Sequence, residues 1–320
     1  CLPRGQGRAS TTRQPRFPPA MLRCGGLGAI SPAPKTEAPL PDHDLPPAIR
    51  ALDDRAWLDL LLKSLVSRDV AGATFPAFPD AETQRRFVGA DGPSTLHEAF
   101  SFYTLLKDRA AALGQPLSDG RAFLDFGCGW GRFLRFFWKD VGAEALHGCD
   151  VWPQAIDLCR DLGVPGNLDR LYHWGRLPYA DASMDIVMSY SVFTHLPEAP
   201  HRHWVAEIAR VLRPGGIFAL TLEPRRFLDF VEALPEGATG WEGDLRRHAA
   251  RIPALRGQFD AGDIAFLPSG AEGDFASALY GDAAVPLAFI ERHWSDWFTI
   301  RDYVDDPGRF FQAVLVVQRK

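Results

Sequence analysis

The sequence predicts an α/β fold around an open, mostly parallel sheet, and three observations lead to this prediction. Short apolar runs alternate with segments of helical periodicity over about residues 119–320, as in strands joined by crossover helices. The run at 122–126 leads through Gly127, Gly129 and Gly131 directly into a helical pattern. The last two runs, at 297–303 and 310–318, are separated by Asp-Asp-Pro-Gly at 305–308, which is typical of a hairpin turn.

The expected elements follow in chain order. Two helices, at about 47–62 and 96–113, precede the strand at 122–126. Further strands are expected at 145–150, 168–174, 185–188 and 217–222, and a helix at 200–212 ends at the Arg-Pro-Gly-Gly of 213–216. Between 225 and 288 the pattern loosens into pieces of helix and Gly/Pro-rich loops. We interpret that region as an insertion between the strands at 217–222 and 297–303.

Composition divides the chain into three parts. Residues 1–47 are rich in Pro and Arg and their first acid is Glu37, so we expect a disordered tail. Residues 48–118 are expected to form a helical cap, and residues 119–320 the ligand-binding domain. The net charge of -5 gives no general attraction to nucleic acid or to anionic membranes, and no apolar run is long enough to span a bilayer.

Cysteine usage indicates a cytoplasmic protein. The five cysteines form no C-x-x-C pair, which is typical of reduced thiols rather than of a disulfide framework or a zinc site. No cluster with metal-ligand spacing is present, so no metal is expected. The sequence does not indicate an oligomeric state.

The glycine turn predicts a ligand site. Glycine lets the backbone bend sharply and approach a ligand, and unpaired N–H groups at the following helix start are expected to face that ligand. The spacing is G-x-G-x-G, with Arg132 in the place of the last glycine of the dinucleotide fingerprint. Asp125 at the strand tip would repel a pyrophosphate and suits a ligand that carries an ammonium group.

These residues resemble the first motif of class I S-adenosylmethionine-dependent methyltransferases. Three later features resemble the same family in order: Asp150, the passage from Leu-Pro-Tyr at 177–179 to Ser-Val-Phe-Thr-His-Leu at 191–196, and Arg-Pro-Gly-Gly at 213–216. The resemblance covers about 87–319. It implies a Rossmann-like fold with a seven-stranded, mostly parallel sheet, an antiparallel C-terminal hairpin and a helical N-terminal cap.

The resemblance also implies roles for particular residues. Asp150 is expected to hold the ribose hydroxyls, although an acid at this place can also cap the next helix. Tyr190 is expected beside the sulfonium of S-adenosylmethionine, and His173 and Trp174 beside its adenine. The expected cofactor-binding residues are Asp125, Phe126, Gly127, Cys128, Gly129, Gly131, Asp150, Val151, His173, Trp174, Ser189 and Tyr190.

The acceptor end of the site is expected at the rim of the fourth and fifth strands. His195 is a candidate general base because imidazole titrates near neutrality, and the alternative is a histidine that packs and hydrogen-bonds locally. Glu223, at a strand tip, either faces the substrate or caps the segment that follows. His97 and Tyr103 from the cap and Tyr280 from the insertion are expected to reach the substrate, although ordinary core or surface roles are the alternative.

The predicted function is methyl transfer from S-adenosylmethionine to an oxygen or nitrogen atom of a small molecule or glycan. Two alternatives stay open. One is a non-catalytic module that keeps the cofactor pocket, and the other is a nicotinamide-dependent oxidoreductase, which the glycine spacing and Arg132 disfavour.

Overall fold

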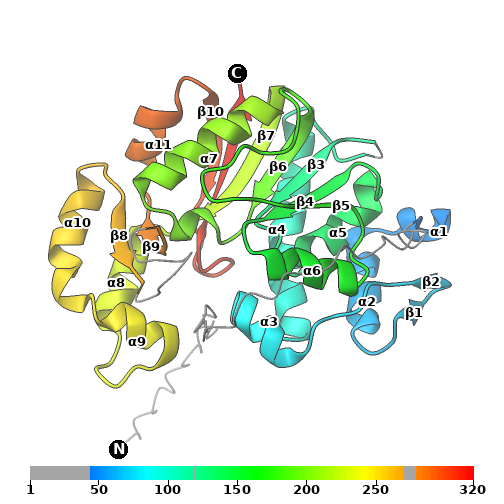
Figure 1. Ribbon diagram of the computed structural model, residues 1–320, viewed down its shortest axis with the longest axis horizontal. Coiled ribbons are helices and arrows are strands. Elements are labelled where there is room, and N and C mark those ends of the chain that lie inside the picture. The colour runs from blue at the N-terminus through cyan, green and yellow to red at the C-terminus, as the bar shows by residue number, and fades with distance from the viewer. Residues whose placement is uncertain (1–43, 119, 270–278) are drawn as a thin grey trace, which may run out of the picture.

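The central element of the fold is a seven-stranded sheet (Figure 1). This computed structural model describes residues 44–118, 120–269 and 279–320. The tail expected at 1–47 therefore lies outside the described residues except for its last four. The sheet contains β3 (Phe123–Phe126), β4 (Leu146–Asp150), β5 (Asn167–Arg170), β6 (Met184–Ser189), β7 (Leu212–Leu222), β10 (Phe298–Val304) and β11 (Ala313–Arg319).

The strand order is β10-β11-β7-β6-β3-β4-β5, and β11 pairs antiparallel with both of its neighbours while the other pairings are parallel. The chain enters at β3 in the middle, builds outward to β5, and returns to build the other half from β6. The carboxyl ends of β3 and β6 therefore form the switch point where open α/β sheets bind ligands. The predicted fold class is confirmed, including the C-terminal hairpin β10–β11.

Alternating side chains along the strands build a separate core on each face of the sheet. Phe123 and Ile186 belong to the core that includes the cap, whereas Leu124 and Val187 belong to the core on the other side, as the two-residue period of a strand requires. The helices that follow the strands are α5 (Arg132–Val141), α6 (Pro153–Asp161), α7 (Glu198–Val211) and α11 (Leu287–Trp294), with a short 3-10 turn η1 (Phe193–His195).

The N-terminal cap is mostly helical and packs on α5. It contains α1 (Pro47–Arg50), α2 (Asp54–Ser64), α3 (Ala81–Val88), α4 (Pro93–Ala112) and an unexpected small hairpin of β1 (Asp69–Val70) and β2 (Ala73–Thr74). Trp57 is fully buried against Phe75 and Trp138, and its indole N–H donates to the carbonyl of Phe136 at 3.0 Å. This aromatic cluster fixes the cap to the sheet domain.

The segment after β7 forms a lobe beside the sheet, seen at the left of Figure 1. It contains α8 (Arg225–Ala233), α9 (Gly240–Arg246), η2 (Ala249–Arg251), α10 (Ile252–Asp260), β8 (Ala265–Pro268) and β9 (Gly281–Ala284). The lobe has its own apolar cluster, which includes Phe227, Leu245 and Leu267. A β-bridge from Glu223 to Ala284 joins it to the end of β7. The strands β8 and β9 gave no clear signal in the sequence.

Two expected boundaries were wrong. The third strand ends at Arg170, so His173 and Trp174 lie in a loop. The segment 213–216 is not a turn before the fifth strand but an irregular part of β7, whose pairing with β6 shifts between Met184 and Ile186. Gly215 has a φ of +80° there, which an irregular strand accommodates when the residue is glycine. Within the described residues, no helix is long and apolar enough to cross a membrane.

Candidate functional site

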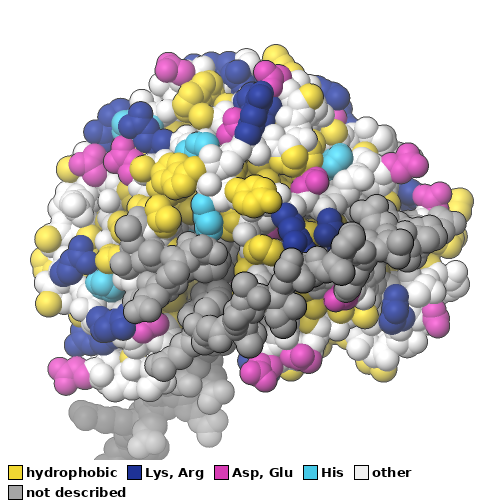
Figure 2. All heavy atoms as spheres, in the orientation of Figure 1, with side chains coloured by type: hydrophobic (Ala, Val, Ile, Leu, Met, Phe, Trp, Pro, Cys, Tyr) yellow, Lys and Arg dark blue, Asp and Glu magenta, His cyan; other side chains and the backbone are white. Residues whose placement is uncertain are grey.

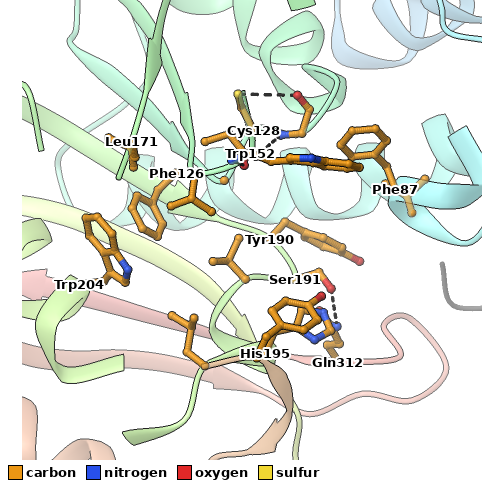
Figure 3. Close-up of a pocket in the computed structure, with 18 of the residues that line it drawn as sticks. Phe87, Phe126, Cys128, Trp152, Leu171, Tyr190, Ser191, His195, Trp204 and Gln312 are labelled. Carbon is orange, nitrogen blue, oxygen red and sulfur yellow. Dashed lines mark hydrogen bonds between the residues drawn. The ribbon is translucent and has the colours of Figure 1, made fainter. Parts of the chain in front are cut away.

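A cavity opens at the carboxyl ends of β3, β4, β6 and β7, between the cap and the lobe. Hydrophobic and histidine side chains gather near the middle of this face in Figure 2. Figure 3 shows Phe87 and Trp152 at one end of the cavity, His195 and Gln312 at the other, and Tyr190 between them. The lining includes Phe87, Glu98, Phe126, Gly127, Cys128, Gly129, Arg132, Asp150, Val151, Trp152, His173, Trp174, Tyr190, Ser191, His195, Trp204, Glu223, Trp241, Leu279, Tyr280, Asp282, Phe311 and Gln312.

The glycine loop forms the wall between β3 and α5. Gly127 has a φ of +82°, and a Cβ there would lie 2.3 Å from Val192. The amides of Gly127 and Cys128 donate to the carbonyl of Cys149 at 2.8 and 3.0 Å, and the amide of Gly131 donates to Cys128. These three amides are therefore used within the fold, and the expectation that N–H groups at the start of α5 face a ligand stays a prediction. The glycines serve the close packing of the loop.

Asp150, at the end of β4, holds the loop from the neighbouring strand. One carboxyl oxygen accepts from the amide of Gly129 at 2.9 Å and the other from the amide of Trp152 at 2.8 Å. Burial raises the pKa of Asp150, and the backbone hydrogen bonds act in the opposite direction. The carboxylate thus caps the turn before α6 and also lines the cavity. Each oxygen keeps a further lone pair for a ligand hydroxyl.

Aromatic side chains flank the cavity beside Asp150. The rings of Phe87 and Trp152 lie 4.8 Å apart, and the guanidinium of Arg86 lies 5.0 Å from the Trp152 ring centre. Trp174 is about half exposed, at 47%, and adopts a φ of +61°, an unusual conformation for a bulky residue. The loop that carries His173 and Trp174 therefore presents flat side chains at the mouth of the cavity.

A buried charged pair lies next to the glycine loop. Arg132 is 4% exposed and its guanidinium is paired with the carboxylate of Glu98 on α4. The hydroxyl of Tyr190 donates to the other oxygen of Glu98 at 3.0 Å, and the Arg132 guanidinium lies 5.2 Å from the Tyr190 ring centre. Sequence reasoning singled out His97 instead of Glu98. Arg132 in place of a glycine was the available signal for this pair.

Asp125 lies on the same side of the sheet as this pair but does not line the cavity. Phe126 lines the cavity, and its neighbour Asp125 points to the opposite face of the strand. Asp125 is 1% exposed, and neither carboxyl oxygen has a hydrogen-bond partner among the described residues. Burial, followed by the charge of Asp150, raises the pKa of Asp125 to about 8, while Arg132 acts in the opposite direction.

A second buried carboxyl group lies at the other end of the cavity. Glu223 is 2% exposed, and its Oε1 accepts from the amide of Gln312 at 3.1 Å. Its Oε2 has no partner among the described residues. Burial, followed by the charge of Asp282, raises the pKa of Glu223 to about 8. The Gln312 amide also donates to Ser191 at 3.0 Å, which fixes the orientation of this carboxyl group.

His195 connects η1 to β9. Its Nδ1 lies 2.8 Å from the carbonyl oxygen of Gly281 and 3.6 Å from Asp282. Because a carbonyl oxygen only accepts, Nδ1 carries the hydrogen and Nε2 is left as an acceptor in the neutral ring. The imidazole stacks on Tyr280 with ring centres 5.0 Å apart. Asp282 in turn accepts from the indole N–H of Trp241 at 3.0 Å.

Five of the predicted site residues do not line the cavity: His97, Tyr103, Asp125, Gly131 and Ser189. His97 is exposed on α4. The fully buried Tyr103 directs its hydroxyl to Asp140 at 2.6 Å and to Asp54 at 2.9 Å, so its role is to join α2, α4 and α5.

Gly131 and Ser189 have structural roles. A Cβ on Gly131 would lie 2.6 Å from Val164, so the glycine lets α5 start close to α6. Ser189 is fully buried and donates to the carbonyl of Phe126 at 3.0 Å, which ties β6 to β3. Within the described part of the chain, no three His, Cys, Asp or Glu side chains are arranged to hold a metal ion.

Comparison with known proteins finds a methyltransferase domain at residues 124–220. The 27-O-demethylrifamycin SV methyltransferase of Amycolatopsis mediterranei (strain S699) is 32% identical over 136 residues, 41% of this chain and 47% of that protein. Methyltransferase GfsG of Streptomyces halstedii is 34% identical over 109 residues, 32% of this chain and 38% of that protein. The chain thus spans less than half the length of these relatives.

Among solved structures, magnesium protoporphyrin IX methyltransferase from Synechocystis PCC 6803 with bound SAH aligns with a TM-score of 0.48 and 14% identity. The alignment covers 75% of this chain and 94% of that chain. The matched domain at 124–220 contains the glycine loop, Asp150 and His195. The matched domain does not include Glu98 of the cap, nor Glu223 and the lining residues of the lobe.

The raised pKa of Asp125 predicts a change in stability with pH. Between its ordinary value near 3.8 and about 8, the unfolded chain releases this proton while the folded protein keeps it, so rising pH favours unfolding. Asp125→Asn mimics the protonated acid. In ligand-free protein, we expect the variant to exceed wild type in free energy of unfolding at pH 8, and the gain to shrink towards pH 5.

Urea unfolding at several pH values measures this effect. The exposed Asp296 offers a matched control, because Asp296→Asn makes the same chemical change at a carboxylate in contact with solvent. A stability difference for Asp125→Asn that does not depend on pH would contradict the prediction.

Proposed function

We propose, from the premise that residues 124–220 match a methyltransferase domain, that the whole chain transfers a methyl group from S-adenosylmethionine to an oxygen or nitrogen atom of a small molecule or glycan. The match supports the class of enzyme and the cofactor expected from the sequence. The observation that carries the proposal is one continuous cavity, which runs from the glycine loop and Asp150 to His195 and Glu223. Donor and acceptor can therefore be aligned in one shielded space, as a displacement requires.

The residues at the glycine-loop end fit the cofactor. Asp150 has lone pairs suited to the ribose hydroxyls, and Phe87, Trp152, His173 and Trp174 offer flat surfaces for the adenine. When bound, S-adenosylmethionine supplies a methyl group on a positively charged sulfur. Val151 and the loop residues Phe126, Gly127, Cys128 and Gly129 complete the cofactor side of the lining.

The pair of Arg132 and Glu98 is suited to the amino-acid end of the cofactor. That end carries an ammonium and a carboxylate, and a buried guanidinium beside a carboxylate presents the complementary charges. The Nε of Arg132 has no partner among the described residues, so it remains available as a donor. Figure 3 shows Tyr190 between Trp152 at one end of the cavity and His195 at the other, where its ring face tolerates a sulfonium. Asp125 lies close enough to Arg132 for the guanidinium to favour the ionised form of this buried acid.

The acceptor side is proposed around His195, Glu223 and Tyr280. His195 holds Gly281 through Nδ1 and stacks on Tyr280, so we assign it a positioning role for β9. Its Nε2 and the free oxygen of Glu223 are the two groups that can take a proton from an acceptor. Two of the relatives are named as methyltransferases, one of them for 27-O-demethylrifamycin SV, which supports a small-molecule acceptor.

Arg132→Gln tests the cofactor assignment. We expect the variant to bind S-adenosylhomocysteine at least about tenfold more weakly than wild type, because a charge-assisted contact is lost. Its affinity for 5′-methylthioadenosine, which lacks the amino-acid end, should change less than about twofold. Calorimetry on both ligands gives the comparison. If both ligands lose the same affinity, Arg132 does not contact the amino-acid end of the cofactor. If the wild-type protein binds NAD more tightly than S-adenosylhomocysteine, the proposed function is contradicted.

His195→Ala and His195→Asn test the positioning role. Because an asparagine amide can still donate to Gly281, we expect His195→Asn to keep the wild-type melting temperature, whereas His195→Ala lowers it by about 2–6 °C. Thermal unfolding with and without S-adenosylhomocysteine measures this. If His195 is the catalytic base instead, both variants keep the melting temperature and both lose methyl transfer by about 10²–10⁴-fold.

A further inference from the structure

The charges that line the cavity are unevenly distributed. Among its described lining residues, the carboxylic acids are Glu98, Asp150, Glu223 and Asp282, and the lysines and arginines are represented by Arg132 alone. Arg132 is paired with Glu98, and Asp150 accepts two backbone amides. Glu223 and Asp282 therefore remain as an acidic end with no lysine or arginine in its lining. Such a surface repels a phosphate or carboxylate on an acceptor.

The carboxyl group of Glu223 is held in one orientation, but only one of its two oxygens is hydrogen-bonded within the described residues. Gln312 holds Oε1, and Oε2 is buried without a partner among the described residues. Arg226 on α8 favours the ionised form of Glu223, but its guanidinium is already paired with Asp305 at 2.6 Å and donates to the Phe310 carbonyl at 3.1 Å. A buried carboxyl oxygen without a partner is costly, and a ligand hydrogen-bond donor would remove that cost.

Asp282 brings a second carboxyl group to the same end. It is 8% exposed, accepts from Trp241, and is close enough to Glu223 to raise its pKa. Two carboxyl groups in a weakly polar space repel each other when both are ionised. A bound cation is the ligand that relieves this repulsion.

The walls at this end are aromatic. Trp241, Tyr280 and Phe311 line the cavity together with the two acids. Faces of aromatic rings attract cations, and acids combined with such rings form the chemistry that recognises ammonium groups. A sugar, in contrast, would be recognised by many donors and acceptors directed at its hydroxyls.

We propose that the methyl acceptor is a basic amine on an apolar or aromatic skeleton, that its ammonium group binds at Glu223 and Asp282, and that Glu223 removes the proton before methyl transfer. This inference rests on the proposed function and narrows its acceptor to nitrogen. The acceptor nitrogen gives one proton to Oε2 of Glu223 and attacks the methyl carbon with the freed electron pair. The nitrogen–carbon bond forms, the carbon–sulfur bond breaks, and its electron pair stays on sulfur. The products are a methylated ammonium and S-adenosylhomocysteine, and Glu223 returns its proton to solvent.

The test compares amines with alcohols of the same skeleton on the protein saturated with S-adenosylhomocysteine. Calorimetry with 2-phenylethylamine against 2-phenylethanol, and with tryptamine against tryptophol, gives the preference for the charged group. We expect wild type to bind each amine at least about tenfold more tightly than its alcohol. Glu223→Gln, which resembles the protonated acid in shape, should reduce this preference to about twofold. Alcohols that bind as tightly as the amines, or a panel in which no amine binds, would overturn the proposal.

Controls separate this outcome from others. Glu236→Gln removes one negative charge from an exposed site on the lobe and should keep the wild-type preference. Asp282→Asn is a second variant of the acidic end and should also weaken the preference. A Glu223→Gln variant that loses affinity for S-adenosylmethionine but not for S-adenosylhomocysteine would place Glu223 on the sulfonium and overturn the amine assignment. If the wild-type protein does not bind S-adenosylhomocysteine, the proposed function itself is refuted.

Discussion

The cavity depends on the two hydrogen bonds by which the Asp150 carboxylate joins the glycine loop to the start of α6. One oxygen holds the amide of Gly129 and the other holds the amide of Trp152. The loop after β3 and the connection after β4 are thereby fixed relative to each other at the switch point of the sheet. The amides of Gly127, Cys128 and Gly131 donate to the carbonyls of Cys149 and Cys128, so hydrogen bonds within the fold hold the glycine loop in place. Such preorganisation reduces the cost of ordering the site on binding.

Buried acids set the chemical character of the site. Asp125 and Glu223 each have a pKa raised to about 8, one beside the cofactor end and one at the acceptor end. Burial is the larger cause in both groups, and a neighbouring aspartate adds to it. Desolvated carboxyl groups without partners lower stability in the free protein. Both groups therefore make the free protein less stable as the pH rises from about 4 towards 8.

The sequence predicted the sheet well, because the strands and the glycine loop depend on local signals. Order and spacing of strands, glycines and Asp150 specify where parallel strands end, and those ends share one edge. Sequence reasoning failed where tertiary packing decides the direction of a side chain. Ser189 is the last residue of β6, next to the lining residue Tyr190, but its hydroxyl donates to the carbonyl of Phe126 in β3. On α4, a difference of one residue separates the exposed His97 from Glu98 in the cavity, and the apolar pattern did not distinguish their directions.

Other residues gave no local signal at all. Gln312 reaches the cavity from the start of the C-terminal hairpin strand, and Trp241 reaches it from a short helix of the lobe. The position of Gln312 follows from the pairing of β11 with β7. The position of Trp241 depends on how the lobe packs, which the loose pattern between 225 and 288 did not reveal. Tyr103 illustrates the opposite case, since its buried hydroxyl is bound by Asp54 of α2 and Asp140 of α5 and joins the cap to the sheet domain.

The most direct measurement of the central claim is transfer of a labelled methyl group. The full chain is incubated with methyl-labelled S-adenosylmethionine and a mixture of small amines, phenols and sugars, and labelled products are identified by mass spectrometry. The account predicts a labelled small molecule formed together with stoichiometric S-adenosylhomocysteine. Tight binding of S-adenosylmethionine with no labelled product from any acceptor class would contradict it and would identify a module that binds the cofactor without catalysis.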